Sequence, residues 1–390
     1  MPLRWPLAVS IVLGLLLPGC GLAQLPKSSE AAQAQLAAQP RPRKRGRATA
    51  EVKRPERFPH RIWAACDFEG GRTRDYGWFG TGVGEGIPTY PGNTRSLKSD
   101  PGRHYVGINP VPGPRMGAVN RMYIRYLLKG ATEAQFQHFS LSSSDNNHIR
   151  VSELDEGQWS EVTLDFTRDG KRNDGTPGVP FAKGERMDDL KVFFAKKDEV
   201  GDREMTIDDV IFFSEEPGMP QEKEPFPNRV IFIASFETGA NSKDKYWPGE
   251  FELAAKNLPG GAYWAAARAV PQKGGPGKWI RVTIKPPRPV GARTKLRFRY
   301  HLTGASEMTV QLFDLTDNDN RHIRLKRLNE GEWTFSILDF TNDGRRNDGT
   351  DTPFAAGHVV DDIFFFVRPA GEAEVDLYVD EICLFDAARP

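Results

Sequence analysis

The stretch GATEAQFQHFSLSSSDNNHIRVSELDEGQWSEVTLDFTRDGKRNDGT (130–176) decides the fold, because it returns later in the chain with the same spacing. It aligns without a gap onto GASEMTVQLFDLTDNDNRHIRLKRLNEGEWTFSILDFTNDGRRNDGT (304–350), and about half of the positions are identical. Outside this block the match continues with small changes in length, as at Phe68 in one copy and Phe236 in the other, so the copies run from about 60 and from about 228. A repeat this long indicates a duplicated domain and not a solenoid unit.

Within each copy, apolar and polar residues alternate with a period of two. The segment 308–313 reads Met-Thr-Val-Gln-Leu-Phe, and 62–69 alternates in the same way. Such alternation places one face of a strand on a core and the other in solvent. The segments LKVFF (190–194) and IFFFV (363–367) are more continuously apolar, as buried strands of a sandwich are. Neither copy shows a period of 3.6, so we predict an all-β chain of two tandem β-sandwiches of jelly-roll type.

The 390 residues suit two domains with accessory segments. We predict copy one over 59–216 and copy two over 228–390, joined by a Pro-rich linker at 217–227. Residues 24–58 are rich in Ala, Gln, Pro, Lys and Arg, so we predict a disordered linker there.

Residues 1–23 have the pattern of a secretory signal peptide. Arg4 precedes an apolar run that is too short to span a bilayer, and small residues follow it. Two outcomes stay open: cleavage after Ala23, or lipidation of Cys20, because the Leu-Pro-Gly-Cys segment resembles a lipobox. We therefore expect an exported protein, extracellular, periplasmic or envelope-attached, which contacts a membrane only through a lipid anchor on Cys20.

The charge and the cysteine content argue against a nucleic-acid-binding protein and against a disulfide-bonded one. The 53 basic and 52 acidic residues give a net charge of +1, so no global field attracts nucleic acid. Beyond Cys20 only Cys66 and Cys383 remain, and the repeat sets them against Ala234 and Ile211. We therefore expect both to be buried, small apolar residues and not a disulfide pair.

Short motifs in both copies resemble those of the galactose-binding-like jelly rolls, to which many carbohydrate-binding modules belong. The first strand ends in Phe-Glu-Gly (68–70), the last reads Ile-Asp-Asp-Val (207–210), and Gly-x-Trp opens a strand at 157–159 and again at 331–333. The resemblance implies a β-sandwich that binds its ligand without catalysis; function itself depends on the site that the fold carries.

The same resemblance implies a structural calcium ion near the ends of the first and last strands. Carried over by position, its ligands are Glu69 and Asp208 in copy one, and Glu237 and Asp380 in copy two. Backbone carbonyls would have to complete the six to eight oxygens that calcium requires. The alternative is that these carboxylates accept hydrogen bonds from turn amides or pair with an arginine.

The loops 165–175 and 339–349 repeat an Asp-Phe-Thr-x-Asp-Gly-x-Arg-Asn-Asp-Gly pattern. Asp, Asn and Gly form turns, and the closing Glu of an EF-hand is missing. We predict ordered structural loops held by Arg–Asp hydrogen bonds.

Catalytic arrangements are weak in this sequence. His148 and His322 are matched, but the Asp-Asp pairs at 188–189 and 361–362 are adjacent, so in a strand they would point to opposite faces. We expect these pairs to mark turns that lead into strands. No GxSxG, HExxH, Walker or Rossmann motif is present, so we predict that the protein is not an enzyme.

Aromatic residues in the loops after each first strand are the candidate sugar contacts. A ring there either stacks on a sugar or packs onto the edge of the sandwich. The candidates are Trp78 and Phe79 in copy one and Tyr246 and Trp247 in copy two, with Trp264 and Trp279 as further candidates. We predict a non-catalytic binding protein for polysaccharide or glycan. The alternative is a structural or protein-interaction module of the cell envelope that binds no sugar.

Overall fold

A computed structural model describes the chain at residues 58–69, 79–80, 83–84, 87–90, 92–110, 113–173, 182–215, 229–237, 247–261, 264–347, 350, 354–371 and 374–387. The predicted signal peptide, the linker at 217–227 and all of 24–58 except Phe58 lie outside these residues.

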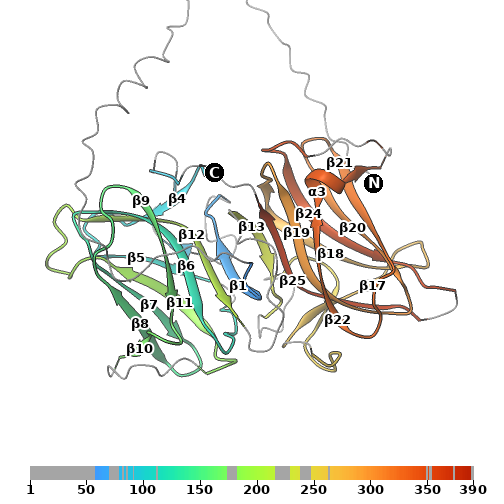
Figure 1. The fold of residues 1–390 in the computed structure, drawn as a ribbon, viewed down its shortest axis with the longest axis horizontal. Helices are drawn as coiled ribbons and strands as arrows, with labels where there is room; N and C mark the ends of the chain where they lie inside the picture. Colours follow the sequence, from blue (N-terminus) through green and yellow to red (C-terminus); the bar gives the residue numbers. More distant parts are fainter. Residues whose placement is uncertain are drawn as a thin grey trace, which may run out of the picture. The chain divides into compact units, whose positions relative to one another are not determined.

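Copy one is built of strands, drawn from blue to yellow-green in Figure 1. They are β1 (Arg61–Cys66), β2 (Phe79–Gly80), β3 (Val83–Gly84), β4 (Ser96–Lys98), β5 (Tyr105–Asn109), β6 (Arg121–Lys129), β7 (Ala134–Ser140), β8 (Asp145–Val151), β9 (Trp159–Asp165), β10 (Lys171–Arg172), β11 (Met187–Phe193) and β12 (Glu204–Ser214).

Among the described residues, copy two repeats this order, adds a short strand, β17 (Val270–Pro271), beside β18 (Lys278–Pro289), and adds one short helix, α3 (Phe340–Asp343), at the end of β22. Its strands are β13 (Arg229–Ala234), β14 (Gly249–Glu250), β15 (Glu252–Ala254), β16 (Ala266–Arg268), β17 (Val270–Pro271), β18 (Lys278–Pro289), β19 (Thr294–Thr303), β20 (Glu307–Asp314), β21 (Asp319–Lys326), β22 (Trp333–Asp339), β23 (Arg345–Arg346), β24 (Val359–Val367) and β25 (Asp376–Asp386).

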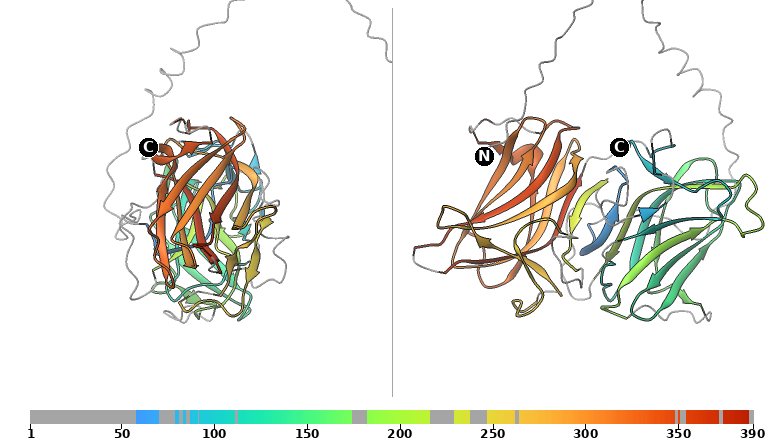
Figure 2. Two further views of the ribbon diagram at one scale, coloured as in Figure 1. Left: turned by 90° about the vertical axis from the view of Figure 1, so that its right-hand side faces the viewer. Right: turned by 180° about the vertical axis from the view of Figure 1, so that it is seen from behind.

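Each copy consists of two antiparallel sheets that face each other across a core, and Figure 2 shows these layers from two further sides. We call the sheet that contains the first and last strands the contact sheet and the other one the open sheet. The contact sheets run β3-β4-β12-β6-β9 with β1 on β12, and β15-β16-β25-β19-β22 with β13 on β25. The open sheets run β10-β8-β7-β11-β5-β2, and β14-β18-β24-β20-β21-β23 with β17 on β18. The predicted all-β sandwich fold is confirmed.

Alternation along the strands builds the two cores. In β7 and β20 every second residue is buried, including Phe136 in copy one and Val310 in copy two. One apolar cluster draws its members from Trp63 to Phe212, and another draws its members from Ile231 to Leu384. The two cysteines of the described residues, Cys66 and Cys383, are buried and free, as the sequence predicted.

Unusual backbone conformations also repeat. Phe68 and Phe236, immediately before the matched glutamates, have φ of 55° and 56°. Asp209 and Glu381, with φ of 42° and 51°, lie at a register shift in the last strand of each copy. A bulge of this kind redirects a side chain, so the duplicated sequence specifies local geometry as well as the core.

No helix among the described residues is long and apolar enough to cross a membrane.

Candidate functional site

The outward face of the open sheet in copy two carries side chains in ordered rows across the strands. One row runs Trp279, Phe366, Thr309, Arg324, and the next runs Arg281, Phe364, Gln311, His322. The residues between them along β18 and β24, such as Ile280 and Phe365, point into the core. Strand pleating therefore presents these two rows on the face away from the core.

Three aromatic rings form a platform on this face. Trp279 stacks on Phe364 and Phe366 at centroid distances of 5.7 and 5.8 Å, and the two phenylalanines stack at 5.6 Å. All three side chains are half-buried, so part of each ring remains open to solvent. We call Trp279, Phe364 and Phe366 the ring platform.

Charged groups beside the ring platform neutralise each other. Arg281 makes a bidentate pair with Asp362 at 3.0 and 2.9 Å, and its guanidinium lies 5.8 Å from the ring centroid of Phe364. Arg324 pairs with Glu307 on the neighbouring strands. The face thus combines apolar rings with hydrogen-bonding groups, and the charges of Arg281 and Arg324 are compensated by Asp362 and Glu307.

A cleft of about 650 Å³ lies on this face beside Phe366. Its walls come from β20, β21, the end of β24 and the turn before β18. Its polar lining is made by Gln272, Ser306, Glu307, Thr309, Gln311, His322, Arg324, Asn347 and Arg368.

The open sheet of copy one repeats the rows with substitutions. The first row consists of Tyr105, Phe193, Gln135 and Arg150. In the second row, Lys191 takes the place of Phe364. Tyr105 and Phe193 lie 5.6 Å apart, and the Lys191 ammonium is 6.0 Å from the Tyr105 ring centroid. Copy one therefore has two rings where copy two has three.

One amide pair is the same on both faces. Gln137 donates to Asn146 Oδ1 at 3.1 Å in copy one, and Gln311 donates to Asn320 in copy two. Amide side chains both donate and accept hydrogen bonds, which suits a ligand rich in hydroxyl groups.

The Asp-Asp pairs correct one prediction. They do not mark turns, because 188–189 lies within β11 and 361–362 within β24. A register shift between Met187 and Leu190 brings both Asp188 and Asp189 to one cleft of about 320 Å³. Burial, and then the neighbouring Asp189, raises the pKa of Asp188. Simple alternation fails here because a bulge interrupts the pleat.

The predicted loop aromatics are only partly visible. Trp78, Tyr246 and the side chain of Phe79 lie outside the described residues. Trp247 packs against the core, with its ring centroid 5.6 Å from that of Phe236, which is the packing alternative. Trp264 lies against the guanidinium of Arg61 of the other copy, at 5.2 Å. Of the described candidates, Trp279 alone lies on the open face.

The sequence analysis missed Phe364, Phe366, Tyr105 and Phe193. The run IFFFV gave no sign that two of its phenylalanines face outward. The matched segment in copy one does give that sign: it reads LKVFF, and a lysine at the position of Phe364 belongs on a solvent face.

The predicted calcium ligands in copy one have other partners. Glu69 accepts from the amides of Thr94 and Arg95 at 2.6 and 2.9 Å, and from the Thr94 hydroxyl at 2.6 Å. Asp208 accepts from the amide of Asp209 at 2.8 Å, and its pKa is raised by burial. Loop amides thus hold Glu69, whereas the amide that donates to Asp208 lies within β12.

In copy two, Glu237 pairs with Arg61 at 2.9 Å and accepts from the amide of Trp264 at 3.2 Å. Burial raises the pKa of Glu237 to about 7, although Arg61 acts in the opposite direction. Asp380 is fully buried, and its Oδ2 has no hydrogen-bond partner among the described residues. A cation would satisfy that oxygen, but the Arg61 guanidinium already neutralises Glu237 beside it.

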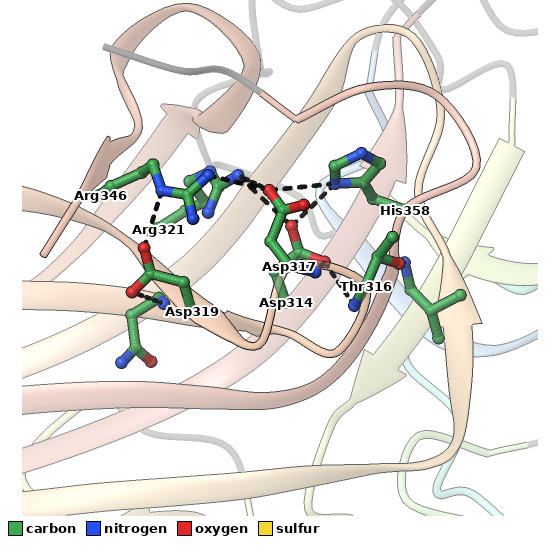
Figure 3. Close-up of polar contacts among 9 residues, drawn as sticks. Asp314, Thr316, Asp317, Asp319, Arg321, Arg346 and His358 are labelled. Atoms are coloured by element: carbon green, nitrogen blue, oxygen red, sulfur yellow. Dashed lines mark hydrogen bonds and ion pairs between the residues drawn. The ribbon is translucent and has the colours of Figure 1, made fainter. Parts of the chain in front are cut away.

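A second acidic cluster lies at one end of the open sheet in copy two. Asp314, Asp317 and His358 are close enough together to hold a metal ion. Figure 3 shows that Arg321 and Arg346 also reach these carboxylates, at 2.6 and 3.1 Å from Asp317 Oδ2. Two guanidinium groups at the would-be ligand atoms make this cluster an ion-pair network.

The described parts of the repeated loops carry Arg–Asp contacts, a hydrogen bond in copy two and an ion pair in copy one, while 174–175 and 348–349 lie outside the described residues. Arg346 donates to Asp319 at 2.8 Å, and its counterpart Arg172 lies 3.7 Å from Asp145. Each loop is thereby held against the first residues of a neighbouring strand, β8 in copy one and β21 in copy two.

Comparison with solved structures returns carbohydrate-binding modules. The N-terminal CBM22-1-CBM22-2 tandem domain of Xyn10C from Paenibacillus barcinonensis covers 85% of this chain and 99% of its own, at 13% identity and a TM-score of 0.30. A family 11 carbohydrate-binding module from Clostridium thermocellum, in complex with a β-1,3-1,4-mixed-linked tetrasaccharide, covers 36% and 85%, at 14% identity and a TM-score of 0.26.

Enzymes also occur among the matches. A xanthan lyase from Paenibacillus covers 87% of this chain but only 27% of its own length, at 11% identity and a TM-score of 0.23. No protein-family model and no curated protein matches the sequence. At these identities and scores the solved structures assign neither a ligand nor an activity to this chain.

Proposed function

We propose that the chain binds polysaccharide on the outward faces of its two open sheets and has no catalytic activity. The observation that carries this proposal is the repeated face: neighbouring rings, stacked in copy two and tilted in copy one, lie beside amide, imidazole and guanidinium groups at matched positions. Ring faces pack on the apolar faces of sugars, and the neighbouring polar groups can hydrogen-bond their hydroxyls.

Two of the carboxylates near the faces, Asp362 and Asp189, already have cationic partners, which favours binding over hydrolysis. Asp362 is occupied by Arg281 and by the Thr283 hydroxyl at 2.8 Å, and Asp189 lies 3.3 Å from the Lys191 ammonium. A hydrolase instead needs one carboxylate to act as acid and a second one at a defined distance across the scissile bond.

Pull-down of the full chain with a panel of insoluble polysaccharides tests the proposal. We expect retention on at least one polymer, and loss of it in the double variant Tyr105→Ala with Trp279→Ala. Trp247→Ala is the matched control, because it removes an indole from the same copy but not from the open face.

An equal loss of retention in Trp247→Ala would indicate that the binding site lies at the loop after the first strand. Retention by no polymer would favour an envelope module without sugar binding. Release of new reducing ends during incubation would contradict the absence of catalysis.

A further inference from the structure

The two contact sheets meet each other across one apolar cluster. It contains matched residues from both copies: Ile62 with Val230, Ile211 with Cys383, and Phe213 with Phe385. These side chains lie on the faces of the contact sheets away from their own cores, which form separate clusters. Strands β1 and β13 accordingly lie side by side, and both copies belong to one compact unit, residues 50–390.

Matched arginines cross this contact in both directions. Arg61 of copy one reaches Glu237 of copy two at 2.9 Å, with both side chains fully buried. Its counterpart Arg229 in copy two reaches Asp67 of copy one at 3.3 Å. Arg297 of copy two also donates to the carbonyl of His60 at 2.6 Å. Buried ion pairs tolerate little displacement, so they fix how the two contact sheets are set against each other.

This arrangement decides where the open faces lie. Each contact sheet is packed between its own core and the other copy, so each open sheet lies beyond its core on the outer side. The two copies together form a stack of four sheets with the open sheets outermost. Since packed sheets are about 10 Å apart, the three spacings place the open sheets about 30 Å from each other. The two faces are turned away from each other, and one extended polymer chain cannot lie on both.

We propose that the protein bridges two polysaccharide chains, one on each open face. This inference rests on the proposed function, because it assigns both open faces to polysaccharide. It differs from ordinary tandem binding, in which two modules hold one chain and gain avidity only if the geometry lets both engage it. The partner on each side is a separate chain, or a distant segment, of the same class of polymer.

A capture assay on the full chain tests the bridge. Particles of an insoluble polysaccharide retained in the pull-down are loaded with protein, washed, and mixed with a fluorescent soluble form of the same polymer. We expect the unaltered protein to hold the label on the particles. Variants of a single face, Tyr105→Ala with Phe193→Ala or Trp279→Ala with Phe364→Ala, should still bind the particles but capture at least tenfold less label.

Other outcomes overturn the bridge in distinguishable ways. If both single-face variants bind particles while the unaltered protein captures no label, bridging is wrong and the proposed function stands. If the single-face variants capture as much label as the unaltered protein, the open faces are not the bridging sites. If no polymer retains the protein, the proposed function fails and the bridge fails with it.

Discussion

The open faces of the two copies share their polar groups but differ in their rings. Copy two has the stacked Phe364 where copy one has Lys191, and the larger indole of Trp279 where copy one has Tyr105. Copy two therefore carries more ring surface on its open face. The difference teaches that the duplication kept the rows of the sheet and varied the rings within them.

The copies differ again at the bulge of the last strand. In copy one, Asp209 pairs with Arg125 of the same copy, whereas Glu381 of copy two lies 3.4 Å from Arg297 and 3.7 Å from Arg61 of the other copy. Copy one pairs its buried carboxylate with an arginine of its own, whereas the carboxylate of copy two lies near one arginine from each copy.

The largest expected effect concerns Arg61, the cation that copy one supplies to Glu237 of copy two. Arg61→Ala should lower the free energy of unfolding by about 3–5 kcal/mol, because Glu237 stays buried without its cation, whereas Glu381 keeps Arg297. Its counterpart Arg229→Ala should lower it by only about 1–2 kcal/mol, because Arg288 still lies 3.3 Å from Asp67. Urea unfolding of both variants measures the difference.

A control separates lost charge from lost packing. The double variant Arg61→Met with Glu237→Gln removes both charges and keeps the side-chain volumes similar. It should therefore recover most of the free energy of unfolding that Arg61→Ala loses. Equal losses for Arg61→Ala and Arg229→Ala would mean that the two copies depend on the contact to the same extent.

The next effect concerns the ring platform. Trp279→Ala should weaken binding of a soluble polysaccharide by copy two at least tenfold, since a buried aromatic anchor at a binding surface is worth about 2 kcal/mol. Tyr105→Ala should weaken binding by copy one less, because that face has a smaller ring surface. Calorimetric titration of each single variant measures both; a larger loss for Tyr105→Ala would reverse the ranking of the faces.

A smaller effect should come from making copy one resemble copy two. Lys191→Phe adds the third ring and should raise the affinity of copy one about threefold, in line with the extra stabilisation of one aromatic contact. The measurement is best made in the Trp279→Ala background, where copy one dominates. Weaker binding would show that the Lys191 ammonium itself contacts the ligand.

The smallest expected effect is that of a chelator. Because amides and Arg61 already hold Glu69 and Glu237, we expect the melting temperature to change by less than about 1 °C with EDTA. A fall of several degrees that disappears in Asp380→Asn would instead place a cation at the unpartnered Asp380 oxygen of copy two.

The fold was predictable because the repeat and its alternation are properties of the chain alone. Strands such as 308–313 need only the period of two to be assigned. The rings of the open face were harder, because three phenylalanines in succession at 364–366 hide which of them face outward. Aligning the copies residue by residue would have shown it, through Lys191.

Other features depend on contacts that no local pattern records. The shift that brings Asp188 and Asp189 to one cleft arises from a bulge against the neighbouring strand. The partner of Glu237 lies 176 positions earlier in the chain, at Arg61, in the other copy. Sequence spacing predicts a face within a strand, but not which sheet of another domain will cover that face.

The crossed arginines have a practical consequence for anyone who wishes to study one half alone. A fragment holding only copy two would expose Val230, Cys383 and Phe385 to water and leave Glu237 without its counter-ion. Such a fragment would tend to aggregate, and a failure to bind sugar would report damage and not specificity. Dissection of this protein is therefore better done by point substitution than by truncation.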